Sequence, residues 1–204
     1  MKLWTVFLVA LGALWGCTAP GPDPVRFGVV KVAFGAPLDP TVADWREDQR
    51  LAIEPIAREL DALGPDFQWV SAGDPEAIVI RPAALEPGVC GYYRLGESMV
   101  QVDPACSEGF SALRKAAAHE VVHAFLYQRF RWSGHLCWYP LNDTPPPTCH
   151  RSMVCQNCLM SPALQGRDEW ADGAEDYSST VVFSEPQPGD IALVSRCFSA
   201  GSCE

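Results

Sequence analysis

The order of apolar and polar residues along the chain predicts five strands and several helices. Short apolar or alternating segments bounded by glycine, proline and aspartate are typical of strands. Such segments lie at residues 27–34, 67–70, 77–80, 91–95 and 99–103. The last two predict a hairpin that turns at Gly96 and Glu97.

Helical spacing of apolar residues occurs in two longer segments. Residues 41–63 carry such a stripe, interrupted by Pro55, which can kink or split a helix. Residues 110–132 form the longest helical pattern, and Ser133-Gly134 is its expected C-cap. Weaker helical patterns follow at residues 170–182 and 191–198. The predicted fold class is α+β, a mixed twisted sheet backed by an N-terminal helix and the long helix, with a disulfide-rich C-terminal part.

The long predicted helix contains the sequence His119-Glu120-Val121-Val122-His123. Residues four apart in a helix stack on one face, so the two imidazoles can bind one metal ion. Glu120 lies beside them, where its carboxylate can take a proton from a water molecule activated by zinc. We therefore predict a Zn²⁺ site with His119 and His123 as ligands and Glu120 as the general base.

The pattern leaves the third zinc ligand open. The candidates are two histidines, His135 and His150, and four carboxylates, Glu169, Asp172, Glu175 and Asp176. If the helix runs to Trp132, Gly134 lies about 16 Å beyond His123, which disfavours His135. The chain between residues 136 and 149 is long enough to return, so we prefer His150 and keep His135 and Glu175 as alternatives.

The first residues of the chain predict export. Met1-Lys2 is followed by an apolar run, residues 3–15, that is too short to span a bilayer and is typical of a signal peptide. The run ends in Leu14-Trp15-Gly16-Cys17, which resembles the bacterial lipobox and implies acylation of Cys17. The predicted organisation is a signal peptide at 1–16, an acylated cysteine with a Pro-rich tether at 17–25, and a single domain at 26–204.

This organisation predicts a bacterial protein of the cell envelope, either an outer-membrane lipoprotein or a secreted protein. Besides Cys17 the chain has eight of its nine cysteines, an even number that predicts disulfides in an exported protein. The net charge is −10 and no basic run occurs, which argues against a nucleic-acid partner. We expect a monomer that contacts the membrane through its lipid anchor alone.

Several segments together resemble the catalytic domain of the metzincin zinc peptidases, in particular matrixin-like and adamalysin-like members. The similar segments are Ala77-Ile78-Val79-Ile80, Gly91-Tyr92-Tyr93, Val100-Gln101-Val102-Asp103, the HExxH helix, and residues 150–162. The resemblance implies that Met160 lies beneath the metal as an apolar floor. It also implies that an edge strand formed by Val100, Gln101 and Val102 pairs with an extended peptide substrate.

The chain departs from the metzincin pattern just after the second histidine. Leu126 stands where that family has a helix-breaking glycine, and Arg129 stands where it has the third histidine. Arginine has no lone pair for a metal, so the resemblance implies an insertion before the third ligand, or a different ligand. The sequence Glu175-Asp176-Tyr177-Ser178 also resembles gluzincin-type peptidases, whose third ligand is a glutamate on a following helix.

The expected function is that of a zinc-dependent endopeptidase that hydrolyses peptide bonds in peptide or protein substrates. Two other functions remain as alternatives. One is a lipid-anchored binding or scaffolding module with a degenerate zinc site, and the other is a metal-dependent amidase that acts on peptidoglycan peptides. Digestion of casein separates a general protease from such an amidase.

Overall fold

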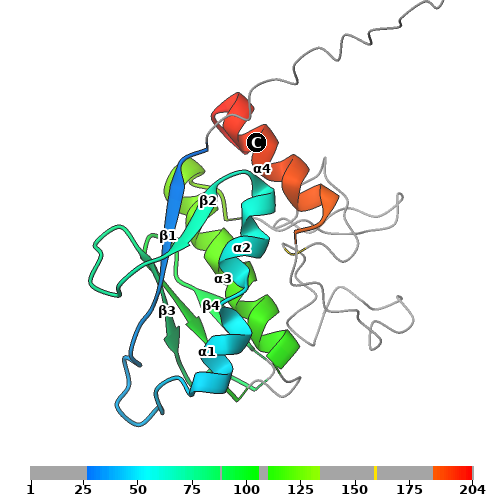
Figure 1. Ribbon diagram of the computed structural model, residues 1–204. Coiled ribbons are helices and arrows are strands. Elements are labelled where there is room, and N and C mark those ends of the chain that lie inside the picture. Colours follow the sequence, from blue (N-terminus) through cyan, green and yellow to red (C-terminus); the bar gives the residue numbers. More distant parts are fainter. Residues whose placement is uncertain (1–26, 88, 106–109, 134–158, 160–185, 204) are drawn as a thin grey trace, which may run out of the picture.

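The computed structural model describes residues 27–87, 89–105, 110–133, 159 and 186–203 (Figure 1). The predicted signal peptide, Cys17, the cysteine-rich loop and the predicted helix at residues 170–182 lie outside these residues. Four predicted site residues lie outside them as well, namely His135, His150, Met160 and Glu175.

A five-stranded sheet forms one layer of the domain. Its strands are β1 (Val29–Phe34), β2 (Asp66–Trp69), β3 (Ile78–Pro82), β4 (Gly91–Tyr93) and β5 (Met99–Val102). They lie in the order β2-β1-β3-β5-β4. The pairs β1–β2, β1–β3 and β3–β5 are parallel, and β4 pairs with β5 in the antiparallel sense. The mixed sheet and the β4–β5 hairpin confirm the strands predicted from the apolar pattern.

The structure contradicts the predicted edge position of Val100, Gln101 and Val102. These residues belong to β5, which pairs with β3 on one side and with β4 on the other. Val100 and Val102 are completely buried, as expected of an inner strand. The hairpin places its first arm on the outside, so β4 is the edge strand beside the long helix.

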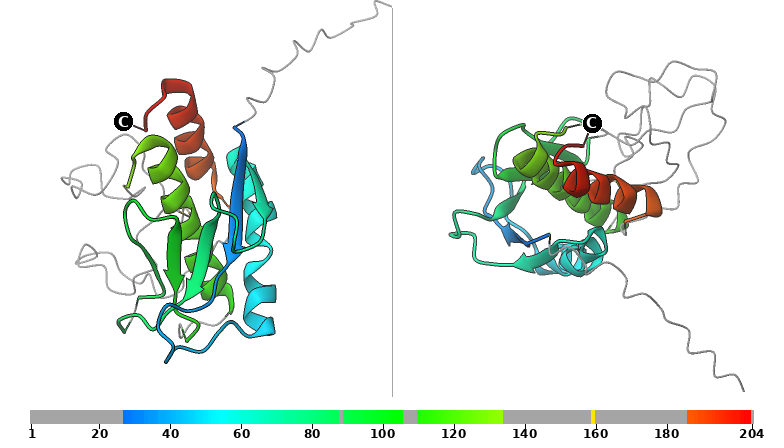
Figure 2. Two further views of the ribbon diagram at one scale, coloured as in Figure 1. Left: turned by 90° about the vertical axis from the view of Figure 1, so that its left-hand side faces the viewer. Right: turned by 90° about the horizontal axis from the view of Figure 1, so that it is seen from above.

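Three helices cover one face of the sheet (Figures 1 and 2). α1 (Glu47–Ile53) and α2 (Ile56–Leu60), followed by the short turn η1 (Asp61–Leu63), take the place of the single predicted N-terminal helix. The break falls at Pro55, because proline has no N–H to donate and its ring clashes with the carbonyl four residues earlier. α3 (Phe110–Phe130) lies beside α1 and α2, against β3, β4 and β5.

The hydrophobic core lies between the sheet and these helices. Completely buried side chains come from both layers: Val32, Ile78, Ile80, Val100, Ile53, Ile56, Leu60, Val121, Val122 and Leu126. Arg114 of α3 and Glu59 of α2 add an ion pair at the rim, with 3.1 Å between Nη2 and Oε1. α3 is therefore held on two sides, by the sheet and by α1 and α2, and a rigid helix is a precise support for a functional site.

The last helix, α4 (Pro188–Ala200), packs against α3 and the start of β1 through an aromatic cluster. The ring of Phe198 lies 4.1 Å from that of Phe27, 4.9 Å from that of Phe130 and 6.1 Å from that of Phe125, measured between centroids. These contacts join the last helix to the core, although its residues are far from α3 in the sequence.

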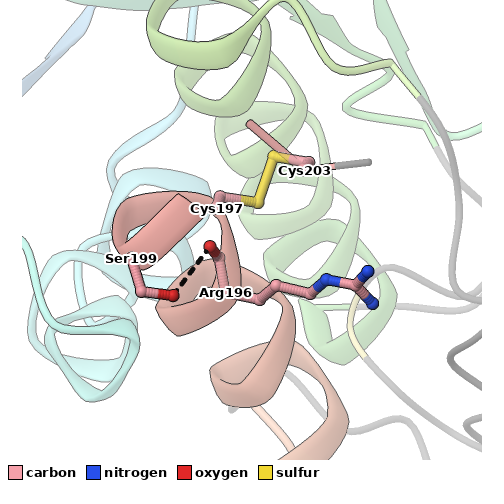
Figure 3. Close-up of a disulfide and its surroundings, with 4 residues drawn as sticks. All are labelled: Arg196, Cys197, Ser199 and Cys203. Atoms are coloured by element: carbon pink, nitrogen blue, oxygen red, sulfur yellow. Dashed lines mark hydrogen bonds between the residues drawn. A yellow bond between two sulfur atoms is a disulfide. The ribbon is translucent and has the colours of Figure 1, made fainter. Parts of the chain in front are cut away.

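A disulfide between Cys197 and Cys203 closes the end of α4 (Figure 3). Gly201 ends the helix with a left-handed φ of 74°, a conformation that favours glycine and turns the chain back toward Cys197. The even number of cysteines predicts disulfides without their pairing, and this bond is one of them. α4 begins at Pro188 rather than at Ile191. Cys90 is also disulfide-bonded.

Candidate metal centre

The two histidines of the HExxH sequence lie together inside the domain. His119 is 5% and His123 is 7% exposed, and their ring centroids are 4.6 Å apart. They lie on α3 just after three buried alanines, Ala116, Ala117 and Ala118, whose small side chains let the helix approach its neighbours closely. The one-turn spacing therefore produces the pair of imidazoles that the sequence predicts.

The orientation of His119 is set by a backbone carbonyl. Its Nδ1 atom lies 2.6 Å from the carbonyl oxygen of Leu159, a completely buried residue. A carbonyl oxygen can only accept a hydrogen bond, so the ring carries its proton on Nδ1 and its lone pair on Nε2. This is the tautomer that a histidine needs to bind a metal through Nε2.

The side chain of Glu120 extends from α3 to the edge strand β4. It is almost completely buried, and its carboxylate accepts a hydrogen bond from the backbone N–H of Tyr93. Burial raises the pKa of Glu120 to about 8, since a charged carboxylate loses its hydration there, and the Tyr93 N–H offsets part of that rise. The strand thus positions this carboxyl, which in the absence of a metal keeps its proton at neutral pH.

The hydrogen-bond pattern of the hairpin shows which backbone groups of β4 face outward. The N–H of Asp103 donates to the carbonyl of Cys90, so these two residues form a hydrogen-bonded pair. Such pairs alternate along an antiparallel ladder, so Tyr92 also points its backbone groups at β5, whereas Gly91 and Tyr93 point theirs at the open edge. The carboxylate of Glu120 therefore lies at the outer edge of β4, with which no strand among the described residues pairs.

The chain reverses direction directly after α3. Arg131 has a φ of 59°, and its N–H donates to the carbonyl of Tyr127, which is a left-handed C-cap without glycine. Its guanidinium lies over the Tyr127 ring, 5.4 Å from the centroid, which helps to stabilise this conformation. Trp132 then turns back and stacks on His123, with ring centroids 6.5 Å apart.

This reversal contradicts the predicted end of the long helix. α3 ends at Phe130 rather than at Trp132, and Arg131 takes the capping place expected of Ser133-Gly134. Burial of the Trp132 ring, which is 8% exposed, favours the early turn. The helix continues through Leu126, a completely buried core residue, so the metzincin-type glycine turn is absent at that position.

The described residues bring together His119, His123 and Glu120, but they contain no group of three or more His, Cys, Asp or Glu side chains that could hold a metal ion. All candidates for the third ligand lie outside the described part of the chain. The third ligand therefore stays a prediction, as do the roles of Met160 and Cys17.

Sequence reasoning missed three residues that shape the site. Gly91 leaves room for the Glu120 side chain, the N–H of Tyr93 binds its carboxylate, and Trp132 stacks on His123. A glycine inside a strand often marks a close approach by another group, so Gly91 carried a usable signal. The contacts of Tyr93 and Trp132 depend on chain segments that meet only in the folded domain.

Comparison of this chain with known protein families, curated proteins and solved structures finds no match. Among the residues that the structure describes, no helix is both long enough and apolar enough to cross a membrane.

Proposed function

We propose that this chain is a zinc-dependent endopeptidase with His119 and His123 as metal ligands and Glu120 as the general base. The observation that carries the proposal is the position of Glu120. Its buried carboxylate lies next to the histidine pair in the sequence and at the open edge of β4 in space. A base at this position can act on a water molecule while a peptide lies along the strand.

The described donor set fits zinc, because imidazole nitrogens are among its preferred protein ligands. His119 also has the second hydrogen bond, from Nδ1 to a backbone carbonyl, that orients a metal-binding histidine and sets its tautomer. When bound, zinc would supply a Lewis acid that polarises a peptide carbonyl and makes water more acidic. The rigid α3 helix would hold both imidazoles in place for it.

Glu120 would move the proton in this reaction. Burial, offset in part by the Tyr93 N–H, raises the pKa of its carboxyl to about 8, and a cation bound nearby would lower that pKa toward the working pH. Glu120 would then take a proton from the attacking water and pass it to the nitrogen of the leaving amine. The Tyr93 N–H favours the ionised form and holds the carboxylate toward the edge of the sheet.

An extended peptide is the substrate that the open edge of β4 suits. Gly91 and Tyr93 direct backbone groups outward. The N–H of Tyr93 already binds Glu120, so a substrate strand would pair with the other outward groups by β-augmentation. Such pairing would draw the backbone of the substrate past the carboxylate of Glu120. We therefore assign the substrate-binding strand to β4 instead of to residues Val100 to Val102. We also propose that the chain is a metzincin-like peptidase, as its sequence resemblance implies.

The end of α3 changes the choice of third ligand. The distance that disfavours His135 assumes a helix that runs to Trp132, whereas Trp132 has already turned back beside His123. Three residues span at most about 10 Å, so the backbone at His135 can also return toward the histidine pair. We therefore rank His135 with His150 as a leading candidate for the third zinc ligand, with Glu175 as the gluzincin-type alternative.

The proposed anchor sets where the peptidase would act. An acylated Cys17 followed by a short Pro-rich tether would hold the domain at the surface of a bacterial membrane and limit its substrates to the cell envelope. Fractionation of cells that express the wild type or Cys17→Ser tests this location. We expect the wild type with the membranes and the variant in soluble fractions.

Zinc content and casein hydrolysis of the purified, oxidised protein test the proposed function. We expect zinc in the wild type, loss of zinc in His119→Ala, and loss in one of the variants His135→Ala, His150→Ala and Glu175→Ala. Glu120→Gln should keep its zinc and lose hydrolysis about 100-fold or more. Unchanged turnover in Glu120→Gln contradicts the mechanism, and a zinc-free wild type favours the binding module instead.

A further inference from the structure

The carboxylate of Asp190 joins two segments that are far apart in the sequence. Asp190 lies in the first turn of α4 and is completely buried. Its Oδ2 atom accepts hydrogen bonds from the backbone N–H groups of Leu159 and Gln187, each with an N···O distance of 2.8 Å. Two short bonds from amide donors thus fix this buried oxygen between the two segments.

Helix capping explains one of these two bonds. Gln187 is the N-cap of α4, and an acidic residue three positions later that accepts the N-cap N–H forms half of a capping box. Leu159 is not part of α4 and lies 31 residues before Asp190. The bond between Asp190 and Leu159 therefore needs a reason other than the start of the helix.

Leu159 connects Asp190 to the candidate metal centre. Its N–H donates to Asp190, and its carbonyl accepts the Nδ1–H of His119 at 2.6 Å. The N–H and C=O of one residue belong to neighbouring peptide groups, so the connection acts through the position of the backbone. A displacement of Leu159 would move the carbonyl that sets the orientation and the tautomer of His119.

Contacts at the C-terminal end of α4 help to fix the position of Asp190. Phe198 packs on Phe125 and Phe130 of α3, and the disulfide at Cys197 closes the last turn. α4 therefore contacts α3 through the aromatic cluster and reaches it again through Leu159 and His119. A helix attached at two separate points can hold a side chain with the precision that a metal site requires.

We infer that Asp190 is a positioning residue of the metal site, which holds His119 through the backbone of Leu159. It follows that the docking of α4 and the binding of zinc at His119 stabilise each other, since both favour the same position of Leu159. This inference rests on the proposed zinc site. The His119 tautomer that it explains can be measured without a bound metal.

Ring-nitrogen NMR of the histidines in the zinc-free, oxidised protein tests the first part of this inference. We expect the Nδ1–H tautomer for His119 in the wild type and a loss of this preference in Asp190→Ala. Asp103→Ala is a matched control, because the Asp103 carboxylate also accepts two backbone N–H bonds, from Leu85 at 3.3 Å and Ala105 at 2.8 Å. The control should keep the wild-type tautomer.

Competition for zinc with a chromophoric chelator tests the second part. Loss of an outer partner of a metal-binding histidine typically costs about 10-fold or more in metal affinity, and we expect a loss of this size in Asp190→Ala. Asp103→Ala should bind zinc like the wild type. Asp190→Asn keeps an oxygen that can accept both N–H bonds, so it should fold even if the alanine variant does not and should recover much of the affinity.

The possible results separate this inference from the proposed function. Wild-type zinc affinity and an unchanged His119 tautomer in a folded Asp190 variant would overturn the inference and leave the zinc site standing. An Nε2–H tautomer of His119 in the wild type would overturn it as well. A wild type that binds no zinc, but whose His119 tautomer depends on Asp190, would refute the proposed function and still support the positioning role.

Discussion

Gly91 and Glu120 lie so close together that a Cβ atom on residue 91 would stand 2.7 Å from Cγ and 3.0 Å from Oε1 of Glu120. The missing side chain is what allows α3 to place its carboxylate against the edge strand. Both contacts are shorter than real Cβ atoms normally make, so a larger residue at this position forces Glu120 to move.

Gly91→Ala should therefore reduce activity more than it reduces zinc binding. Displacing Glu120 moves the general base without changing His119 or His123, so we expect at least about a tenfold loss of casein hydrolysis with zinc retained. Overpacking should also cost about 1–3 kcal/mol of stability. Gly73→Ala is the control, because a Cβ there meets nothing closer than 3.8 Å. Equal activity of the two variants would contradict the assigned role of Gly91.

The raised pKa of Glu120 predicts that the metal-free protein loses stability as the pH rises. The pKa is about 8 in the folded state and 4.5 in an ordinary carboxyl, so the folded state binds the proton more tightly. The resulting stabilisation is fully present below pH 4.5 and is lost as the pH rises toward 8. Between these limits we expect a change on the order of 4 kcal/mol in the free energy of unfolding.

Urea denaturation of chelator-treated wild type and Glu120→Gln across this pH range measures that change. Every other ionisable group is the same in both proteins, so the difference between the two curves isolates Glu120. As the pH rises, the free energy of unfolding of the wild type should fall relative to that of Glu120→Gln. Parallel curves would show that the carboxyl of Glu120 titrates normally.

The left-handed conformation of Arg131 predicts opposite outcomes for two substitutions. Arg131→Gly removes the steric cost of a φ of 59° and should leave stability within about 1 kcal/mol of the wild type, despite the lost contact with Tyr127. Arg131→Val places a β-branched side chain in the same conformation and should be about 1–2 kcal/mol less stable than the glycine variant. Thermal unfolding of both variants checks this order, and a more stable valine variant would contradict the observed turn.

The disulfide between Cys197 and Cys203 should contribute measurably to the docking of α4. It closes a short loop, with a sequence separation of 6, and the chain-entropy relation gives a stabilisation of about 2 kcal/mol for a loop of that size. The double variant Cys197→Ser/Cys203→Ser should unfold at lower temperature and, because α4 carries Asp190, release zinc more readily. Melting curves and chelator competition measure the two effects, and an unchanged melting temperature would contradict the first.

The periods of the apolar pattern were sufficient to predict the strands, the long helix and the α+β class of the described domain. Pro55 marked the position at which the first helix divides, and the even number of cysteines predicted disulfides without the Cys197–Cys203 pairing. The pattern was not sufficient for the end of α3, because the turn at Arg131 depends on the burial of Trp132 against His123. The metzincin resemblance placed the open edge on Val100 to Val102, and the alternation along a strand could not correct this, because it does not reveal how many partners that strand has.

The sequence by itself determined that His119 and His123 share one face of a helix with Glu120 beside them, because the pitch of an α-helix converts a spacing of four residues into neighbours. Only the tertiary structure decided what surrounds them. Gly91 from the edge strand, Leu159 and Asp190 reach the site from distant parts of the chain. Their contacts arise from long-range packing, which local spacing does not encode.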